Sequence, residues 1–168
     1  MYLDGFPDVE ELRQRFNPAQ ANLISAHVTL CREDEVQDWC ALEQQLRAIG
    51  PIELTIEFGM PIREDNLVLL PCVGSTAQFD DLRRQLLLHT GREPRKHLPH
   101  VTLIHPRSGV CTDDIFKQIT ASSAPFGVSF REVFLIEQRD GGPWYRLAVG
   151  AGQEAGGQRR CRCSAQRG

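Results

Sequence analysis

His27-Val28-Thr29-Leu30 and His100-Val101-Thr102-Leu103 are the same four residues in the same order, 73 positions apart in a chain of 168 residues. With 5 His and 7 Thr in the chain, chance gives about 0.2 copies of a His-x-Thr triplet and far fewer of the complete string. The two copies therefore indicate a site that is built from two related parts of the chain.

The stretches around the two strings also match each other. Val9-Glu-Glu-Leu-Arg13 corresponds to Phe79-Asp-Asp-Leu-Arg83, and residues 51–56 correspond to residues 125–130. The separations are 70, 73 and 74 residues, a drift that small loop insertions would produce. The sequence therefore predicts an internal duplication, with its halves related by an approximate twofold axis.

Each string is expected on an extended strand, where residues i and i+2 project from the same face. His27 then shares a face with Thr29, and His100 shares one with Thr102. Two imidazoles suit displacement at phosphorus, because a neutral ring accepts a proton while a charged ring donates one. The hydroxyls can donate hydrogen bonds to the non-bridging oxygens of a phosphate. This chemistry requires no metal and no cofactor.

Helical and strand-like patterns follow one another along the chain. Capping boxes at residues 8–11, 34–37 and 75–78, and a single cap at Thr112, predict four helices. The expected strands cover residues 23–30, 51–58, 67–70, 98–104, 125–131, 133–138 and 144–149. The last two strands are expected to form a hairpin across Asp140–Pro143.

Length and composition fit one domain, with 41% hydrophobic and 24% charged residues. We expect this domain over residues 1–150, with one lobe over about 1–72 and a second over about 73–150. Residues 151–168 hold four arginines against one glutamate, a net charge of +3, and are expected to form a disordered basic tail. The net charge of −3 for the whole chain argues against sequence-independent coating of nucleic acid.

No apolar run approaches the roughly 18 residues of a membrane-spanning helix, and the amino terminus lacks the pattern of a secretory signal. The six cysteines show no disulfide-framework spacing, so they are expected to be reduced thiols. These features predict a soluble protein of the cytoplasm.

Four further residues are candidates for substrate binding. Thr55 and Ser129 occupy matched repeat positions on the hydrophilic faces of their strands, and Arg131 follows Ser129 by two residues. Trp144 shares a strand face with Arg146 and is a candidate for stacking on a base.

Two other groups of residues lie near the second string. A zinc site of His97, His100 and His105 is disfavoured, because spacings of three and five residues place consecutive members on opposite faces of an extended strand. The basic residues nearby either attract an anionic substrate end or are simply solvated: Arg92, Arg95, Lys96 and Arg107.

Together these features resemble the 2H phosphoesterases, named for two His-x-Thr/Ser-x motifs, and within them the 2'-5' RNA ligase and cyclic phosphodiesterase group. The resemblance covers about residues 8–149 and is carried by Ser25–Leu30, by Leu98–Leu103 and by the hairpin that follows. It implies the α+β class, with two pseudo-symmetric lobes, each an antiparallel sheet backed by helices, which enclose a central cleft.

The resemblance also implies roles for the motif residues. His27 and His100 would act as acid and base, and Thr29 and Thr102 would bind phosphate. In the usual assignment of the family His100 activates water and His27 protonates the departing ribose oxygen, but the near-symmetric repeat leaves this order open. The implied partners are RNA 3' ends or nucleotides that carry a 2',3'-cyclic phosphate. Neither a membrane nor a stable protein partner is implied.

Two alternatives stay open at the level of the sequence. One is a non-catalytic nucleotide- or RNA-end-binding module on the same fold, and the other is reversible 2'-5' RNA ligation. The chain also departs from the family pattern, because only Met1–Phe6 is available for the strand that normally precedes the first helix. We expect that strand to be short or missing, through a late start or a truncated chain.

Overall fold

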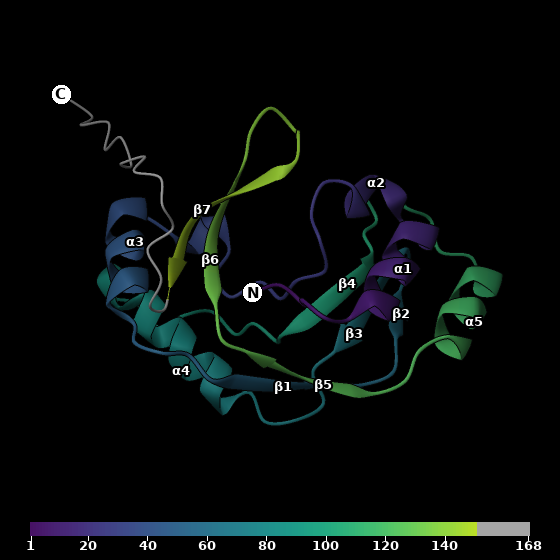
Figure 1. Cartoon of the computed structure of the whole chain (residues 1–168), viewed down its shortest axis with the longest axis horizontal. Coiled ribbons are helices and arrows are strands. Elements are labelled where there is room, and N and C mark those ends of the chain that lie inside the picture. The colour runs from purple at the N-terminus through teal and green to yellow at the C-terminus, as the bar shows by residue number, and fades with distance from the viewer. Residues whose placement is uncertain (151–168) are drawn as a thin grey trace.

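The computed structural model describes residues 1–150 and has the α+β composition that the sequence predicts. Its strands form three small antiparallel sheets, in the orders β2-β3-β4, β1-β5 and β6-β7 (Figure 1). The strands are β1 (Leu54–Phe58), β2 (Ile62–Glu64), β3 (Leu67–Pro71), β4 (His100–Ile104), β5 (Phe126–Phe130), β6 (Val133–Gln138) and β7 (Trp144–Gly150). The helices are α1 (Pro7–Phe16), α2 (Pro18–Ala21), α3 (Trp39–Ala48), α4 (Ala77–Leu86) and α5 (Asp113–Ala121), with 3-10 turns at Glu33–Glu35 and Leu88–Thr90.

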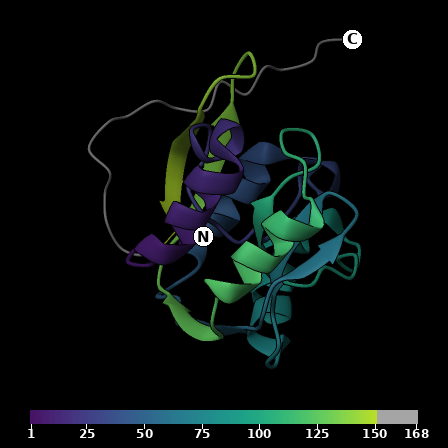
Figure 2. The same ribbon diagram turned by 90° about the vertical axis from the view of Figure 1, so that its right-hand side faces the viewer.

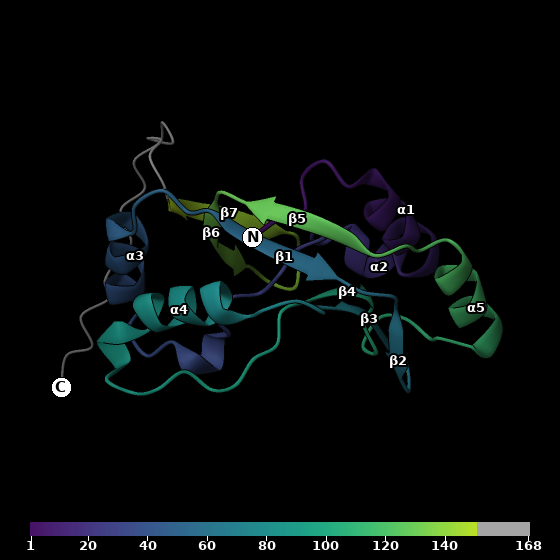
Figure 3. The ribbon, with the colours of Figure 1, turned by 90° about the horizontal axis from the view of Figure 1, so that it is seen from below.

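The helices lie toward the two ends of the molecule, and most of the strands lie between them (Figures 1 and 3). One end holds α1, α2 and α5, which Figure 2 shows from the front, and the other end holds α3 and α4. α1 contacts β4, and α3 contacts both β7 and α4. Because these pairs join early and late segments, each packed group combines both halves of the sequence. The two lobes expected from the duplication stay a prediction.

The core is built from alternate strand residues and from the inner faces of the helices. In β1, Leu54, Ile56 and Phe58 are buried, whereas Thr55 and Glu57 are exposed, as the alternation predicts. The most deeply buried apolar residues of the strands and the two later helices are Ile56, Phe58, Val68, Leu70, Phe79, Val101, Leu103, Ile104 and Ile119. Removal of this apolar surface from water is the main force that joins the sheets.

One of the four predicted helix caps is confirmed. The Thr112 hydroxyl accepts a hydrogen bond from the Ile115 amide at 3.3 Å, and α5 begins directly after it. The other three caps are wrong, because the helices begin at Pro7, Trp39 and Ala77. Pro7 suits the first position of a helix, since it has no amide hydrogen to leave unpaired. At the start of α3 the amide hydrogen bonds are accepted by Asp38 instead of Asp34.

The strand predicted over residues 23–30 is wrong, because only an isolated bridge between Tyr2 and His27 forms there. The segment nevertheless pairs with the amino terminus through main-chain hydrogen bonds. The Leu3 amide donates to the Ala26 carbonyl at 2.9 Å, and the Val28 amide donates to the Met1 carbonyl at 2.8 Å. The amino-terminal strand is therefore short, as expected, and is reduced to these few residues.

β6 and β7 form the predicted hairpin. Asp140 and Gly141 at its turn have positive φ angles of 51° and 70°, which glycine adopts freely and aspartate tolerates. The Trp144 amide donates to the Leu23 carbonyl at 3.0 Å. The start of β7 therefore lies beside the segment that leads into the first His-Val-Thr-Leu motif.

Cys31, Cys72 and Cys111 are free thiols, in agreement with the sequence expectation. Cys40 is disulfide-bonded, so the expectation of six reduced thiols is wrong at that position; spacing along the chain does not report which thiols the fold brings together. Within residues 1–150, no helix is both long and apolar enough to cross a membrane. The predicted basic tail over residues 151–168 lies outside the described residues.

Candidate active site

Both motifs bury their apolar residues and leave their polar residues partly accessible. Val28 and Val101 are 0% exposed, and the motif residues that are partly exposed are His27, Thr29, His100 and Thr102. The second motif lies on β4, which pairs with β3, whereas the first is supported by the amino terminus. The alternation predicted from the sequence is therefore present in both copies, although only one copy lies in a regular strand.

The two motif histidines are held in the same way. His27 Nδ1 lies 2.8 Å from the carbonyl oxygen of Ser25, and His100 Nδ1 lies 2.9 Å from that of Leu98. Since a carbonyl can only accept a hydrogen bond, Nδ1 carries the hydrogen in each ring. Nε2 of each imidazole is then the nitrogen that can accept or donate a proton.

A third histidine connects the two motifs. His97 Nε2 donates to the carbonyl oxygen of Thr29 at 3.1 Å, and the centroid of its ring lies 5.6 Å from that of His100. The first motif is thus linked to the second through one side chain. The sequence analysis considered His97 only as a zinc ligand and missed this contact.

The environment of His27 disfavours its charged form. Burial lowers the pKa of His27 to about 4, and the positive charges of Arg13 and His100 act in the same direction. His27 is therefore neutral at pH 7, with a lone pair on Nε2. A positive charge on His100 therefore opposes protonation of His27.

Two buried arginines lie at matched repeat positions next to the motifs, and the sequence analysis missed both as site residues. Arg13, on α1, is 2% exposed and donates to the Ile24 carbonyl at 2.7 Å and to Glu10 at 2.8 Å. The same Glu10 carboxylate oxygen accepts from the Ala26 amide at 2.7 Å. Arg13 and Glu10 therefore fix the main chain just ahead of His27.

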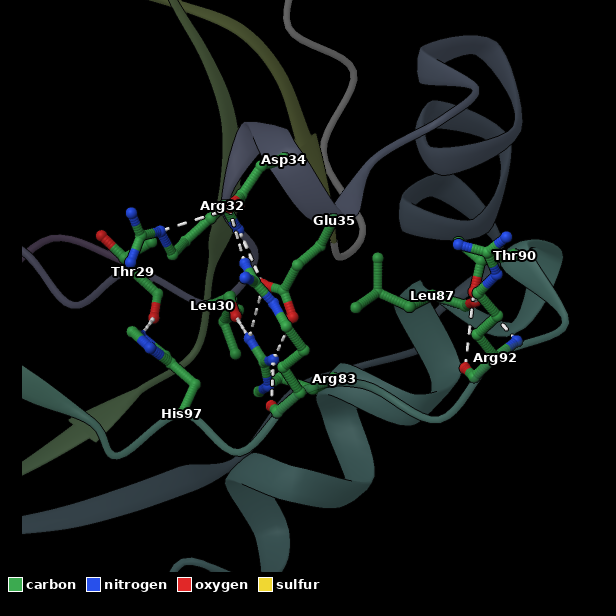
Figure 4. A network of polar contacts seen from close by, with 11 residues as sticks. Thr29, Leu30, Arg32, Asp34, Glu35, Arg83, Leu87, Thr90, Arg92 and His97 are labelled. Atoms are coloured by element: carbon green, nitrogen blue, oxygen red, sulfur yellow. Dashed lines mark hydrogen bonds and ion pairs between the residues drawn. The ribbon is translucent and has the colours of Figure 1, made fainter.

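Arg83, on α4, is 1% exposed and binds segments next to both motifs (Figure 4). Its guanidinium donates to the carbonyl of Leu30, at the end of the first motif, and to the carbonyl of Arg95 at 2.9 Å. Glu35 accepts from Arg83 at 2.6 Å and balances its charge. Burial raises the pKa of Glu35, but the hydrogen bonds from Arg83 and from the Arg32 amide, together with the positive charges of Arg83 and Arg95, outweigh this effect and the pKa is lowered.

Thr55 and Ser129 face each other across β1 and β5. They are direct partners in the strand register, and their hydroxyl oxygens lie 3.0 Å apart. A twofold axis that relates two antiparallel strands passes between equivalent residues, so this pair marks the axis of the predicted duplication. Arg131 is exposed immediately after β5. The binding of substrate by these three residues stays a prediction.

A pocket of about 180 Å³ lies beside the first motif and includes Trp144. Its other lining residues are Tyr2, residues 21–25 and Arg146. The guanidinium carbon of Arg146 lies 4.2 Å from the ring centroids of both Tyr2 and Phe134, which is within the range of cation–π contacts. The Tyr2 ring centroid is 6.2 Å from that of His27. The sequence analysis selected Trp144 but missed Tyr2.

Within residues 1–150, no group of three or more histidine, cysteine, aspartate or glutamate side chains could hold a metal ion. The side chains near the motifs supply groups for proton transfer and hydrogen bonding. They comprise two imidazoles with free Nε2 atoms and two threonines that share their accessible faces.

Residues 3–142 match the family model of the 2'-5' RNA ligase superfamily. No curated protein matches the chain significantly. The matched region contains both motifs and both buried arginines, whereas Tyr2, Trp144 and Arg146 fall outside it. The chain therefore belongs to the 2'-5' RNA ligase superfamily, in agreement with the resemblance that its two motifs carry.

Proposed function

We propose that the protein is a phosphodiesterase that opens 2',3'-cyclic phosphates at RNA 3' ends or on small nucleotides. The observation that carries this proposal is the matched pair His27 and His100, each held at Nδ1 by a carbonyl two residues before it. Membership of the 2'-5' RNA ligase superfamily supports a phosphoesterase or ligase. The two imidazoles can supply both proton transfers of the reaction, so the proposed step requires no metal.

In the proposed reaction a water oxygen attacks the cyclic phosphorus, and one imidazole takes the proton from that water at Nε2. The bond between phosphorus and one ribose oxygen then breaks, and the second ring, charged at the start, donates its Nε2 proton to that oxygen. Thr29 and Thr102 donate hydrogen bonds to the non-bridging oxygens, where negative charge increases in the transition state. The product is a ribose with one phosphomonoester and one free hydroxyl.

The lowered pKa of His27 favours this residue as the base. A ring that is neutral at pH 7 has its Nε2 lone pair available for the proton of the water, and the charge that it gains is offset by the anionic transition state. His100 is then the acid. This order reverses the usual family assignment stated above, and it gives the two motifs different tasks despite their identical sequences.

The direct test is a turnover assay in the presence of EDTA on 2',3'-cyclic nucleotides and on RNA oligonucleotides that end in a cyclic phosphate. We expect hydrolysis to a single phosphomonoester, and identification of the 2'- or 3'-phosphate shows which bond breaks. Binding of these compounds without product would support the non-catalytic module instead. Joining of a cyclic-phosphate end to a 5'-hydroxyl end would show the ligase direction.

The order of acid and base can be tested with a cyclic substrate in which sulfur replaces the departing bridging oxygen. A thiolate leaves without protonation, so loss of the acid matters little for this substrate. We expect His100→Ala to recover most of its activity on the sulfur compound, whereas His27→Ala does not. Recovery by His27→Ala alone would restore the usual family order.

A further inference from the structure

A small cationic pocket lies next to the first motif, separate from the pocket that includes Trp144, and the proposed reaction does not use it. It has a volume of about 140 Å³ and is lined by Arg32, Glu35, Arg95, Lys96 and His97. Pockets for whole organic ligands usually measure about 300–1,000 Å³. This pocket has room for a phosphate group but not for a nucleotide.

The charges around this pocket leave an excess of positive charge. Asp34 forms ion pairs with both Arg32, at 3.7 Å, and Arg95, at 2.7 Å. Glu35 is paired with the buried Arg83. Counting Lys96 as well, four basic side chains face two carboxylates, an excess of two positive charges. An anion with two exposed oxygens could accept hydrogen bonds from these cations and offset their excess charge.

The pocket is also preorganised. The Arg83 guanidinium binds the Arg95 carbonyl, and Glu35 accepts from both Arg83 and the Arg32 amide, so the segments that carry the cations are fixed to each other (Figure 4). The Arg95 guanidinium donates to Asp34 at 2.7 Å. Because these segments are already ordered, an anion that binds here does not have to order them.

His97 joins this pocket to the motif residues. Its ring lines the pocket, its Nε2 atom contacts the Thr29 carbonyl, and its centroid lies 5.6 Å from that of His100. A phosphate in the pocket would therefore lie close to the reacting phosphate, with His97 between them. At an RNA end with a cyclic phosphate, the neighbouring phosphate is the one attached to the 5' oxygen of the same ribose.

We propose that Arg32, Arg95 and Lys96 bind this 5' phosphate, so that the preferred substrate is an RNA 3' end and not a mononucleotide. This inference rests on the proposed function, since it names the substrate class for the same site. Among residues 1–150, the side chains that line this pocket include no Phe, Tyr or Trp, which suits a phosphodiester better than a base. The aromatic pocket beside the first motif remains available for the terminal base.

The test compares a 2',3'-cyclic mononucleotide that has a 5' hydroxyl with a dinucleotide that ends in the same cyclic nucleotide. We expect a KM for the dinucleotide that is about tenfold lower in the unmodified protein, the effect of one charge-assisted phosphate contact. Lys96→Met should abolish most of this difference, and Lys117→Met, which removes an equal charge on α5, should preserve it. Equal KM values for both substrates, or an equal loss in both lysine variants, would overturn the inference.

A binding measurement separates this inference from the proposed reaction. Titration with a nucleoside 3'-phosphate and with the corresponding dinucleotide 3'-phosphate requires no turnover. We expect the dinucleotide to bind about tenfold more tightly, with a steeper salt dependence, and Lys96→Met to reduce this preference. If the protein shows this preference but hydrolyses neither cyclic substrate, the phosphate pocket stands and the proposed reaction fails. If hydrolysis occurs without the preference, the reaction stands and the pocket fails.

Discussion

Arg13 and Arg83 occupy the same position of the repeat and are equally buried, yet they hold different parts of the site. Arg13 binds the Ile24 carbonyl and supports only the segment ahead of His27. Arg83 binds Leu30 from the first motif and Arg95 from the segment ahead of the second. The partner of Arg13, Glu10, is 32% exposed, whereas Glu35, the partner of Arg83, is 6% exposed. One arginine thus has a local role, and the other fixes the two motifs relative to each other.

The largest effect is expected on turnover, when either half of the repeat loses its motif histidine. We predict that His27→Ala and His100→Ala each lower the turnover of a cyclic phosphate by about 100- to 10,000-fold, because each removes one proton-transfer group. Circular dichroism should show an unchanged fold. His105→Ala is the control, with turnover expected within about twofold of the unmodified protein. Near-normal turnover in both motif variants would refute the enzyme assignment.

The two arginines should differ in their contribution to stability. Arg83→Met leaves Glu35 buried without its cation, and loss of one partner of a buried ion pair costs about 3–5 kcal/mol. Arg13→Met leaves the more exposed Glu10 beside the Ala26 amide, so we expect a loss of about 1–3 kcal/mol. Urea unfolding of both variants measures the difference. Glu35→Gln combined with Arg83→Met should be less harmful than Arg83→Met alone, and equal losses for the two single variants would contradict the comparison.

Acid should lower the stability of the folded protein through His27, in the first half of the repeat. Its pKa is lowered from 6.5 to about 4 in the folded protein, so between these values the unfolded chain binds more protons. The free energy of unfolding should therefore fall as pH falls from about 6.5 toward 4. We expect His27→Gln to flatten this dependence in urea titrations at several pH values, although His97, whose pKa burial also lowers, keeps part of the slope. An unchanged slope in His27→Gln would mean that the ring is solvated.

The smallest effect is expected at the junction of the halves. Thr55 and Ser129 are both exposed, and their hydrogen bond at 3.0 Å joins β1 to β5. A double-mutant cycle with Thr55→Val and Ser129→Ala should give a coupling of about 0.5–1 kcal/mol in the free energy of unfolding. A much larger coupling would assign this pair a role in holding the halves together that its exposure does not suggest.

Much of the site could be predicted because its signals are local. The repeated His-Val-Thr-Leu string selects His27 and His100, and strand alternation predicts which motif residues are buried, even where the first motif does not form a regular strand. The matched, exposed positions of Thr55 and Ser129 could also be predicted, although their direct pairing across β1 and β5 was not. These predictions required only the two-residue period of a strand and the repeated sequence.

The remainder depends on contacts between distant segments. The match between Val9–Arg13 and Phe79–Arg83 was visible in the sequence, but an arginine on a helix is usually exposed. Its burial follows from carbonyls that loops bring to it, such as Leu30, which lies 53 residues from Arg83. Tyr2 and His97 were missed for the same reason. The start of α3 was predicted at Asp34, but Asp38 caps the helix. The direction in which the chain enters a helix decides which side chain can reach the free amides.

β1 and β5 pair over their full length although Leu54 and Phe130 are separated by more than 70 residues. During synthesis β1 emerges with its edge unpaired and must wait until β5 has left the ribosome. Leu54, Ile56 and Phe58, buried in the finished molecule, are available for wrong association throughout that interval. The same late closure carries an entropy cost that grows with the length of the loop, so the joining of these two strands should slow folding.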